Sequence, residues 1–170
     1  MSPSDLDRQI LLLARTRGHR RSAERVIAAY SRLGEHAACW LILGAAGTFL
    51  DRDSDRRRAW AQGLEVVAAA YVANYAVKLT VRRHRPELPA LPPLTGTVSR
   101  LSFPSAHATS SFAAARAFCP LAPAAGLYAA AGAFAISRPY LGVHYPSDVI
   151  AGALLGTAIA ELWPRRGMRP

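Results

Sequence analysis

The chain has 170 residues, a length that favours a single domain. Hydrophobic residues make up 51% of it, and its formal net charge is +10. A strongly basic chain raises the question of a nucleic-acid partner. The arginines, however, gather in bunches between apolar segments, and no nucleic-acid-binding motif is present. We therefore expect no nucleic-acid partner, and the basic flanks beside apolar helices favour attraction to anionic lipid headgroups.

The N-terminal residues predict amphipathic helix rather than a membrane span. Leu6, Ile10 and Leu13 share one face of residues 4–33, while the arginines lie elsewhere and Gly18 interrupts the pattern. Two interpretations stay open: a helix lying in the membrane interface, or a helix that caps the bundle by ordinary packing. The predicted organisation is an N-terminal amphipathic region, a transmembrane core and a basic tail, at residues 1–34, 35–164 and 165–170.

Apolar segments of helix length predict an all-α fold, a polytopic transmembrane bundle of about five spans. The first segment is short for about 30 Å of hydrocarbon. It must borrow from residues 28–34, which would bring Glu35 and His36 into the membrane, where polar groups usually face a polar site. The alternative is that these two residues mark the interface. The five segments are residues 36–50, 59–81, 105–119, 124–136 and 147–163, with a solvated loop at 51–58 and with Gly152 and Gly156 spaced for close packing in the last.

Three polar runs interrupt these segments: KLTVRRHRP at 78–86, FPSAH at 103–107 and SRPYLGVHYPSD at 137–148. Together they supply cations, imidazoles, hydroxyls and a carboxylate, a set suited to binding phosphate and attacking it with an imidazole. Lys78 is the one lysine beside 20 arginines, which favours a role for a compact ammonium group. Because successive spans alternate in direction, the loops at 82–104 and 138–146 are expected on the same side.

The spacing of these runs resembles the three-part signature of the type 2 phosphatidic acid phosphatase family, in its membrane branch. The resemblance covers residues 78–148 and implies a metal-independent lipid-phosphate phosphatase. One departure is Ala106, where the family usually has glycine. Alanine is compatible with a negative φ at this position but would be strained at a positive one.

The resemblance implies roles for eight residues. His144 is expected to attack phosphorus and form a phosphohistidine, with Asp148 fixing its tautomer. His107 is expected to act first as general acid and then as general base. The phosphate oxygens are expected to be held by Lys78, Arg85, Ser105, the backbone at Ala106, and Arg138.

Neither a metal nor another cofactor is expected. Two histidines and an aspartate could ligate a metal, but the neighbouring lysine and arginines would repel a cation. Cys39 and Cys119 lie in apolar segments without a CxxC or histidine-spaced pattern, so they predict neither a disulfide nor a zinc site. Arg82, Arg83 and Arg100 are interpreted as interface anchors.

Within the family, the run Gly34-Glu35-His36 and the run LSFPSAH at 101–107 are similar to the actinobacterial branch of decaprenylphosphoryl-5-phosphoribose phosphatases. This similarity implies a polyprenyl-linked sugar phosphate of cell-wall synthesis as substrate, in a bacterial plasma membrane. Undecaprenyl diphosphate and phosphatidic acid or phosphatidylglycerol phosphate are the alternatives. From another class, a non-catalytic lipid-phosphate binder would be expected to have lost a catalytic residue. The sequence leaves open the side of the membrane that the site faces, and its small-residue faces are compatible with a homo-oligomer.

Overall fold

The computed structural model describes residues 3–164, and over that range it is all-α, as expected, with a single isolated β-bridge between His84 and Leu101. The predicted basic tail, residues 165–170, lies outside the described residues. Residues 82–105 form the long proline-rich loop that the sequence predicts. The elements, in chain order, are α1 (Pro3–Thr16), α2 (Arg21–Leu33), the short 3₁₀ helix η1 (Glu35–Ala37), α3 (Ala38–Leu50), α4 (Ser54–Val81), α5 (Ala106–Phe118), α6 (Ala124–Tyr140) and α7 (Pro146–Leu162).

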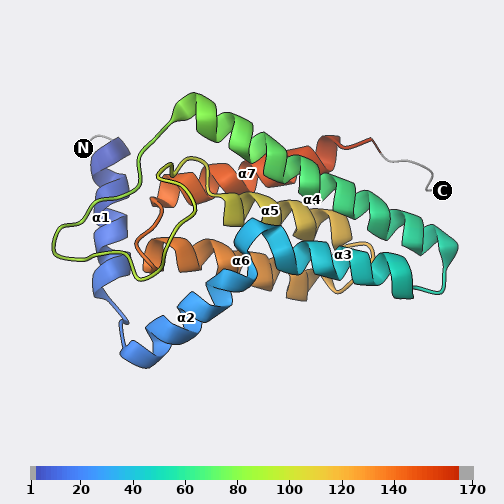
Figure 1. Ribbon diagram of the computed structural model, residues 1–170, viewed down its shortest axis with the longest axis horizontal. Helices are drawn as coiled ribbons and strands as arrows, with labels where there is room; N and C mark the ends of the chain where they lie inside the picture. The colour runs from blue at the N-terminus through green and yellow to red at the C-terminus, as the bar shows by residue number, and fades with distance from the viewer. Residues whose placement is uncertain (1–2, 165–170) are drawn as a thin grey trace.

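Helix α5 is the centre of the bundle, with α4, α6 and α7 packed around it (Figure 1). Most of its side chains are buried, and many are alanine or serine, which allow neighbouring backbones to approach closely. A Cβ added at Gly156 of α7 would lie 2.0 Å from the carbonyl oxygen of Thr109, and one at Gly152 would lie 2.6 Å from that of Ser105. The close packing predicted at these two glycines is confirmed, and it fixes the start of α5 against α7.

Two helices extend beyond their predicted limits. Helix α4 begins at Ser54 within the stretch expected to be a solvated loop, because Asp53 caps it by accepting hydrogen bonds from the amides of Asp55 (2.7 Å) and Arg56 (3.3 Å). Helix α6 continues through Tyr140, so the part of the third polar run from 137 to 140 is helical rather than loop. Pro139 is tolerated there because its missing N–H removes only one hydrogen bond from the last turn.

Helix α1 lies across one end of the bundle (Figure 1) and packs on α6 and α7 through a face that carries Asp7, Leu11 and Arg15, all buried. Arg15 donates hydrogen bonds to the carbonyl oxygens of Tyr140 (3.1 Å) and Pro92 (2.7 Å). The predicted apolar face of this helix stays exposed, at Leu6, Ile10 and Leu13. The two interpretations of the amphipathic region therefore describe two faces of one helix: one caps the bundle, and the other presents apolar side chains outward.

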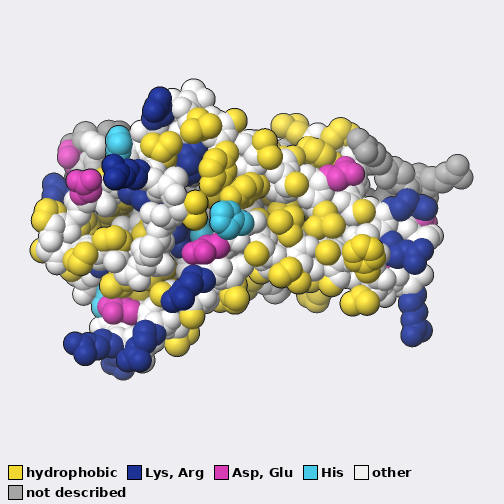
Figure 2. Space-filling model, viewed as in Figure 1, with side chains coloured by type: hydrophobic (Ala, Val, Ile, Leu, Met, Phe, Trp, Pro, Cys, Tyr) yellow, Lys and Arg dark blue, Asp and Glu magenta, His cyan; other side chains and the backbone are white. Residues whose placement is uncertain are grey.

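The five predicted spans are not confirmed by helix length. Within residues 3–164, α4 is the one helix that is long and apolar enough to cross a membrane, and α2 with η1 and α3 would form a second only as one span bent by 49°. Helices α3 and α5 have 13 residues each and reach about 20 Å, against about 30 Å of hydrocarbon. Hydrophobic side chains nevertheless cover much of the bundle in the view of Figure 2, whereas Lys and Arg gather toward its two ends.

Candidate active site

The eight predicted site residues come together at the end of the bundle where α1 and the 82–105 loop lie. One pocket is lined by Lys78, Arg85, Ala106, His107, Arg138 and His144. Ser105 and Asp148 are fully buried next to it. Four helices deliver these groups: α4 ends just after Lys78, α5 begins at Ala106, α6 ends just after Arg138 and α7 begins just before Asp148. The expectation that the two loops share one side is confirmed.

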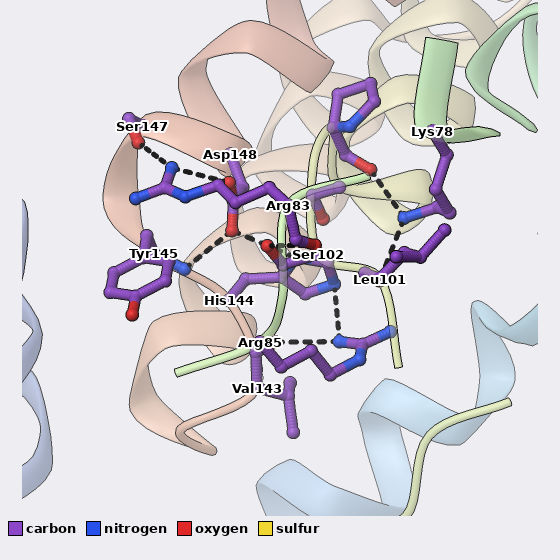
Figure 3. Close-up of polar contacts among 12 residues, drawn as sticks. Lys78, Arg83, Arg85, Leu101, Ser102, Val143, His144, Tyr145, Ser147 and Asp148 are labelled. Carbon is purple, nitrogen blue, oxygen red and sulfur yellow. Dashed lines mark hydrogen bonds and ion pairs between the residues drawn. The ribbon is translucent and has the colours of Figure 1, made fainter. Parts of the chain in front are cut away.

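His144 is held between Arg85 and Asp148 (Figure 3). Nη1 of Arg85 lies 3.1 Å from Nε2 of His144, and since a guanidinium can only donate, Nε2 presents its lone pair. Nδ1 therefore carries the proton and faces Oδ2 of Asp148 at 3.5 Å, which is too long for a well-formed hydrogen bond. Burial lowers the pKa of His144 well below its usual 6.5, and the charges of Arg85, Arg138 and Lys78 lower it further. The imidazole is therefore neutral, and its Nε2 lone pair accepts a hydrogen bond from Arg85 at the pocket.

Asp148 is fixed by groups from three parts of the chain. The amide of Tyr145 donates to Oδ2 at 2.9 Å, and Nη1 of Arg83 donates to Oδ1 at 2.9 Å. The same guanidinium donates to Ser147 Oγ (2.7 Å) and to Oδ2 of Asp7 on α1 (2.7 Å), as Figure 3 shows for the first of these. The interpretation of Arg83 as an interface anchor is wrong, because its guanidinium is tied to two carboxylates. The position of Arg83 inside the first polar run was the one sequence signal that it belongs to the site. Nothing in the sequence indicated a role for Asp7.

Three cations are held at the pocket by neutral oxygen atoms. Nζ of Lys78, 3% exposed, donates to the carbonyl oxygens of Pro104 (3.0 Å) and Leu101 (3.3 Å). Arg85 donates from Nε to the carbonyl of Ser99 and from Nη1 to that of Val143, both at 2.7 Å. Burial lowers the pKa of Arg85 to about 10, which leaves it charged at neutral pH. No ion pair among the described residues neutralises Lys78, Arg85 or Arg138, so the pocket attracts an anion.

The start of α5 adds neutral donors to this cationic pocket. Its first-turn amides have no acceptor within their own helix, and the helix dipole places a partial positive charge there. Ser105 Oγ and Arg138 Nε are buried, with no hydrogen-bond partner among the described residues. Buried donors of this kind normally have partners, and the oxygens of a bound phosphate would supply them. Within residues 3–164 the non-glycine residues with positive φ are His36, Ala37 and Arg82, so alanine is accommodated at position 106.

His107 is oriented by α2. Its Nε2 lies 2.9 Å from the backbone carbonyl oxygen of Ser31, and because a carbonyl can only accept, Nε2 carries a proton. Nδ1 is then the nitrogen that gains or loses a proton. The hydroxyl of Ser31 also accepts a hydrogen bond from Nη1 of Arg138. Ser31 thus contacts two predicted site residues, and the sequence contains no sign of this link because the amphipathic pattern of residues 4–33 does not show which residues of α2 face the site.

The fold and the site together define an all-helical protein in which two imidazoles and three buried cations surround a place for a tetrahedral oxyanion. No group of three or more His, Cys, Asp or Glu side chains within residues 3–164 is placed to hold a metal ion. The chemistry that this arrangement supports is phosphoryl transfer to an imidazole, with cations and amides binding the equatorial oxygens.

Comparison with known proteins leads to the same class. Residues 59–167 match the PAP2 superfamily. The chain is 45% identical over 127 residues to the decaprenylphosphoryl-5-phosphoribose phosphatase of Mycolicibacterium smegmatis, a match that covers 73% of this chain and 68% of the relative. The protein of the same name from Mycobacterium tuberculosis is 44% identical over 136 residues, covering 78% and 73%.

A solved structure is similar over nearly the whole chain. It is the transmembrane PAP2 type phosphatidylglycerolphosphate phosphatase from Bacillus subtilis, with a TM-score of 0.72, 25% sequence identity, and coverage of 94% of this chain and 83% of that one. The sequence and structural matches agree with each other and with the resemblance carried by the three polar runs. The chain belongs to the PAP2 superfamily.

Proposed function

We propose that the chain is a metal-independent lipid-phosphate phosphatase whose substrate is a polyprenyl-linked sugar phosphate, decaprenylphosphoryl-5-phosphoribose. The observation that carries the chemistry is the single pocket in which His144 and His107 flank the cationic groups of Lys78, Arg85 and Arg138. The substrate is proposed from the relatives that bear this name and share 44–45% of their residues with the chain over the matched region.

In the proposed first step, the Nε2 lone pair of His144 attacks phosphorus. A P–N bond forms as the bond from phosphorus to the sugar oxygen breaks, and Nδ1 of protonated His107 gives its proton to that oxygen. Asp148 stabilises the charge that develops on the imidazole of His144. The three cations, Ser105 Oγ and the amides around Ala106 bind the equatorial oxygens throughout.

In the second step, water attacks the phosphohistidine. Neutral His107 takes a proton from this water as the new P–O bond forms and the P–N bond breaks. Inorganic phosphate leaves, and both histidines return to their starting protonation states. The net reaction is hydrolysis of a phosphate monoester to an alcohol and phosphate, and the proposal requires no cofactor.

We further propose that the chain is integral to a bacterial plasma membrane, with α3 to α7 inserted and α1 lying at the interface on its apolar face. Large apolar side chains are at least 60% exposed on four of these helices, an arrangement that water disfavours and lipid accommodates. The Bacillus neighbour described as transmembrane supports this placement. The exposed residues are Ile42, Phe49, Leu50, Val72, Leu79, Ile136, Ile150, Leu154 and Leu162.

The test is phosphate release from purified protein in detergent with a chelator present. The panel contains the polyprenyl sugar phosphate, undecaprenyl diphosphate, phosphatidic acid and phosphatidylglycerol phosphate. We expect the sugar phosphate to be hydrolysed fastest, and His144→Ala to lower its turnover by at least about 10³-fold. Turnover that the chelator abolishes, or that persists in the His144→Ala variant, would contradict the mechanism. Tight binding of the lipids without any release would favour a non-catalytic lipid-phosphate binder.

A further inference from the structure

The active-site pocket extends beyond the eight predicted residues, to the break between α2 and α3. Its other lining residues include Glu35 and His36 from η1, Tyr71 and Tyr75 from α4, and residues 96–99 from the long loop. Tyr71 and Tyr75 lie on the same face of α4 as Lys78, two turns and one turn before it respectively. None of these side chains has a part in the two chemical steps above. They form one wall of the space through which a substrate must extend.

The backbone at this break is held in an uncommon conformation. His36 (φ 53°) and Ala37 (φ 59°) both lie in the left-handed region, which costs non-glycine residues on the order of 1–3 kcal/mol each and is concentrated at ligand sites. The turn brings the imidazole of His36 to α4, where its Nδ1 lies 2.8 Å from the hydroxyl of Tyr71. The ring of Tyr71 in turn contacts the ring of Tyr75, with the two centroids 5.1 Å apart.

The position of this wall relative to the histidines identifies the part of the substrate that it meets. In an in-line displacement the leaving oxygen lies opposite the attacking Nε2 of His144, and here it lies beside His107, its proton donor. Gly34 packs directly on that donor, since a Cβ added at Gly34 would lie 2.9 Å from Cδ2 of His107. A leaving group that extends away from His107 therefore passes Glu35, His36 and Tyr71, whereas the phosphate stays among the cations.

We propose that Glu35, His36, Tyr71 and Tyr75 form a subsite for the part of the leaving group next to the scissile oxygen, an uncharged group that carries hydroxyls, such as a pentose; this inference rests on the proposed phosphatase function. A carboxylate accepts hydrogen bonds from hydroxyls, while the phenol and imidazole both donate and accept. The two tyrosine rings, tilted by 48° to each other, supply apolar surface for the carbon face of a sugar. An apolar leaving group would desolvate these polar groups without replacing their hydrogen bonds.

The carboxylate of Glu35 also acts against one alternative substrate. When a diphosphate is hydrolysed, the leaving group is itself a phosphate, and its negative charge would lie beside Glu35. Like charges at close range disfavour binding, and such repulsion is a common way to reject a related ligand. The subsite therefore selects a sugar phosphate over a polyprenyl diphosphate by repulsion, and over a diacylglycerol phosphate by hydrogen bonding.

The experiment measures kcat/KM of the native chain, Tyr71→Phe and Glu35→Gln in detergent on three substrates. They are farnesylphosphoryl-5-phosphoribose, farnesyl diphosphate and a short-chain phosphatidic acid. For Tyr71→Phe we expect the ratio of sugar phosphate to phosphatidic acid turnover to fall about tenfold, the effect of one hydrogen bond. For Glu35→Gln we expect the ratio of diphosphate to sugar phosphate turnover to rise at least about tenfold. Tyr128→Phe, a half-exposed tyrosine of α6 outside the pocket, is the matched control and should change neither ratio.

Each result separates the subsite from the proposed function. If each variant loses kcat/KM equally on all three substrates, and the native chain still prefers the sugar phosphate, the subsite is overturned and the proposed function is left intact. No release from the sugar phosphate by the native chain, with turnover of the other lipids, would overturn the proposed substrate and the subsite together. Melting temperatures in detergent within about 2 °C of the native value would show that a changed ratio does not reflect misfolding.

Discussion

At the scale of single residues, the site depends on a small polar network behind the nucleophile. Arg83 connects Asp148 of α7 to Asp7 of α1, and its guanidinium also lies 4.0 Å above the ring centroid of Tyr145. These contacts hold the carboxylate that faces Nδ1 of His144. Arg83 does not line the pocket, so we interpret it as a positioning residue that acts through Asp148.

Replacing Arg83 should change both the rate of the enzyme and its pH dependence. The native His144 has a pKa well below 6.5, so protonation of this imidazole does not limit the rate near pH 6. In Arg83→Gln one nearby positive charge is lost and the full charge of Asp148 acts on His144, which raises its pKa. We expect kcat/KM at pH 7.5 to fall about tenfold or more, and the acid limb of its pH profile to move to higher pH.

The matched control for this prediction is Arg100→Gln, because Arg100 lies exposed in the same loop and its side chain makes no hydrogen bond or ion pair with another described residue. Substrate ionisation affects the two variants equally, so a shift between their profiles reports on the enzyme. A loss of rate in Arg83→Gln with an unshifted acid limb would contradict the positioning role and indicate a general structural defect.

At the scale of elements, the contact between α5 and α7 determines where the catalytic groups stand. The amide of Ser105, at the start of α5, donates a hydrogen bond to the carbonyl of Asp148 at 2.9 Å, and Gly152 and Gly156 allow the two backbones to touch below that point. A displacement between these helices would therefore separate His107 on α5 from Asp148 on α7.

We predict that Gly156→Ala destabilises the chain, although alanine is the better helix former by about 1 kcal/mol. The added Cβ would meet backbone atoms that cannot move aside, and overpacking of this kind costs about 1–3 kcal/mol. The melting temperature in detergent should fall by several degrees. Gly132→Ala is the control, because nothing lies within 4 Å of a Cβ at that position of α6, and it should be neutral or stabilising. Equal melting temperatures for the two variants would show that α5 and α7 can separate without cost.

At the scale of the whole molecule, the distribution of exposed side chains matters more than the hydropathy of any one helix. Only α4 is long and apolar enough by itself among the described helices. The exposed residues Ile150 and Leu154 nevertheless lie one turn apart on α7, and comparable side chains lie exposed on α3, α4 and α6. A bundle that presents such a surface on several helices is expected to be surrounded by lipid.

The membrane placement predicts that Leu154→Arg lowers the amount of protein recovered in the membrane fraction after a carbonate wash. An arginine in the middle of a span costs about 2.5–3.5 kcal/mol on insertion scales. Leu162→Arg is the control, since Leu162 ends α7 and is 83% exposed, where a long cationic side chain can reach the interface. Recovery of Leu154→Arg, or of the native chain, as a monodisperse protein without detergent would contradict the membrane placement.

The sequence by itself determined the helical class, and it predicted eight site residues that the fold brings together, because both depend on short-range spacing. The run from Lys78 to Pro86, the run around His107, and the four-residue step from His144 to Asp148 each lie within one segment. Their chemical roles stay predictions, which rest on residue type and on the family resemblance. The sequence also placed the close contacts at Gly152 and Gly156.

Only the tertiary structure decided which other residues hold those eight in place or lie beside them in the pocket. Asp7 meets Arg83 across 76 residues, Ser31 meets His107 across another 76, and His36 meets Tyr71 across 35. Contacts of this kind leave no periodic trace in one sequence, because each depends on how whole helices cross. The same reason explains two features that were not predicted. Burial of Asp7 and Arg15 on α1, and helical structure through Ser137 and Arg138 on α6, follow from packing at the end of the bundle, which local residue patterns do not contain.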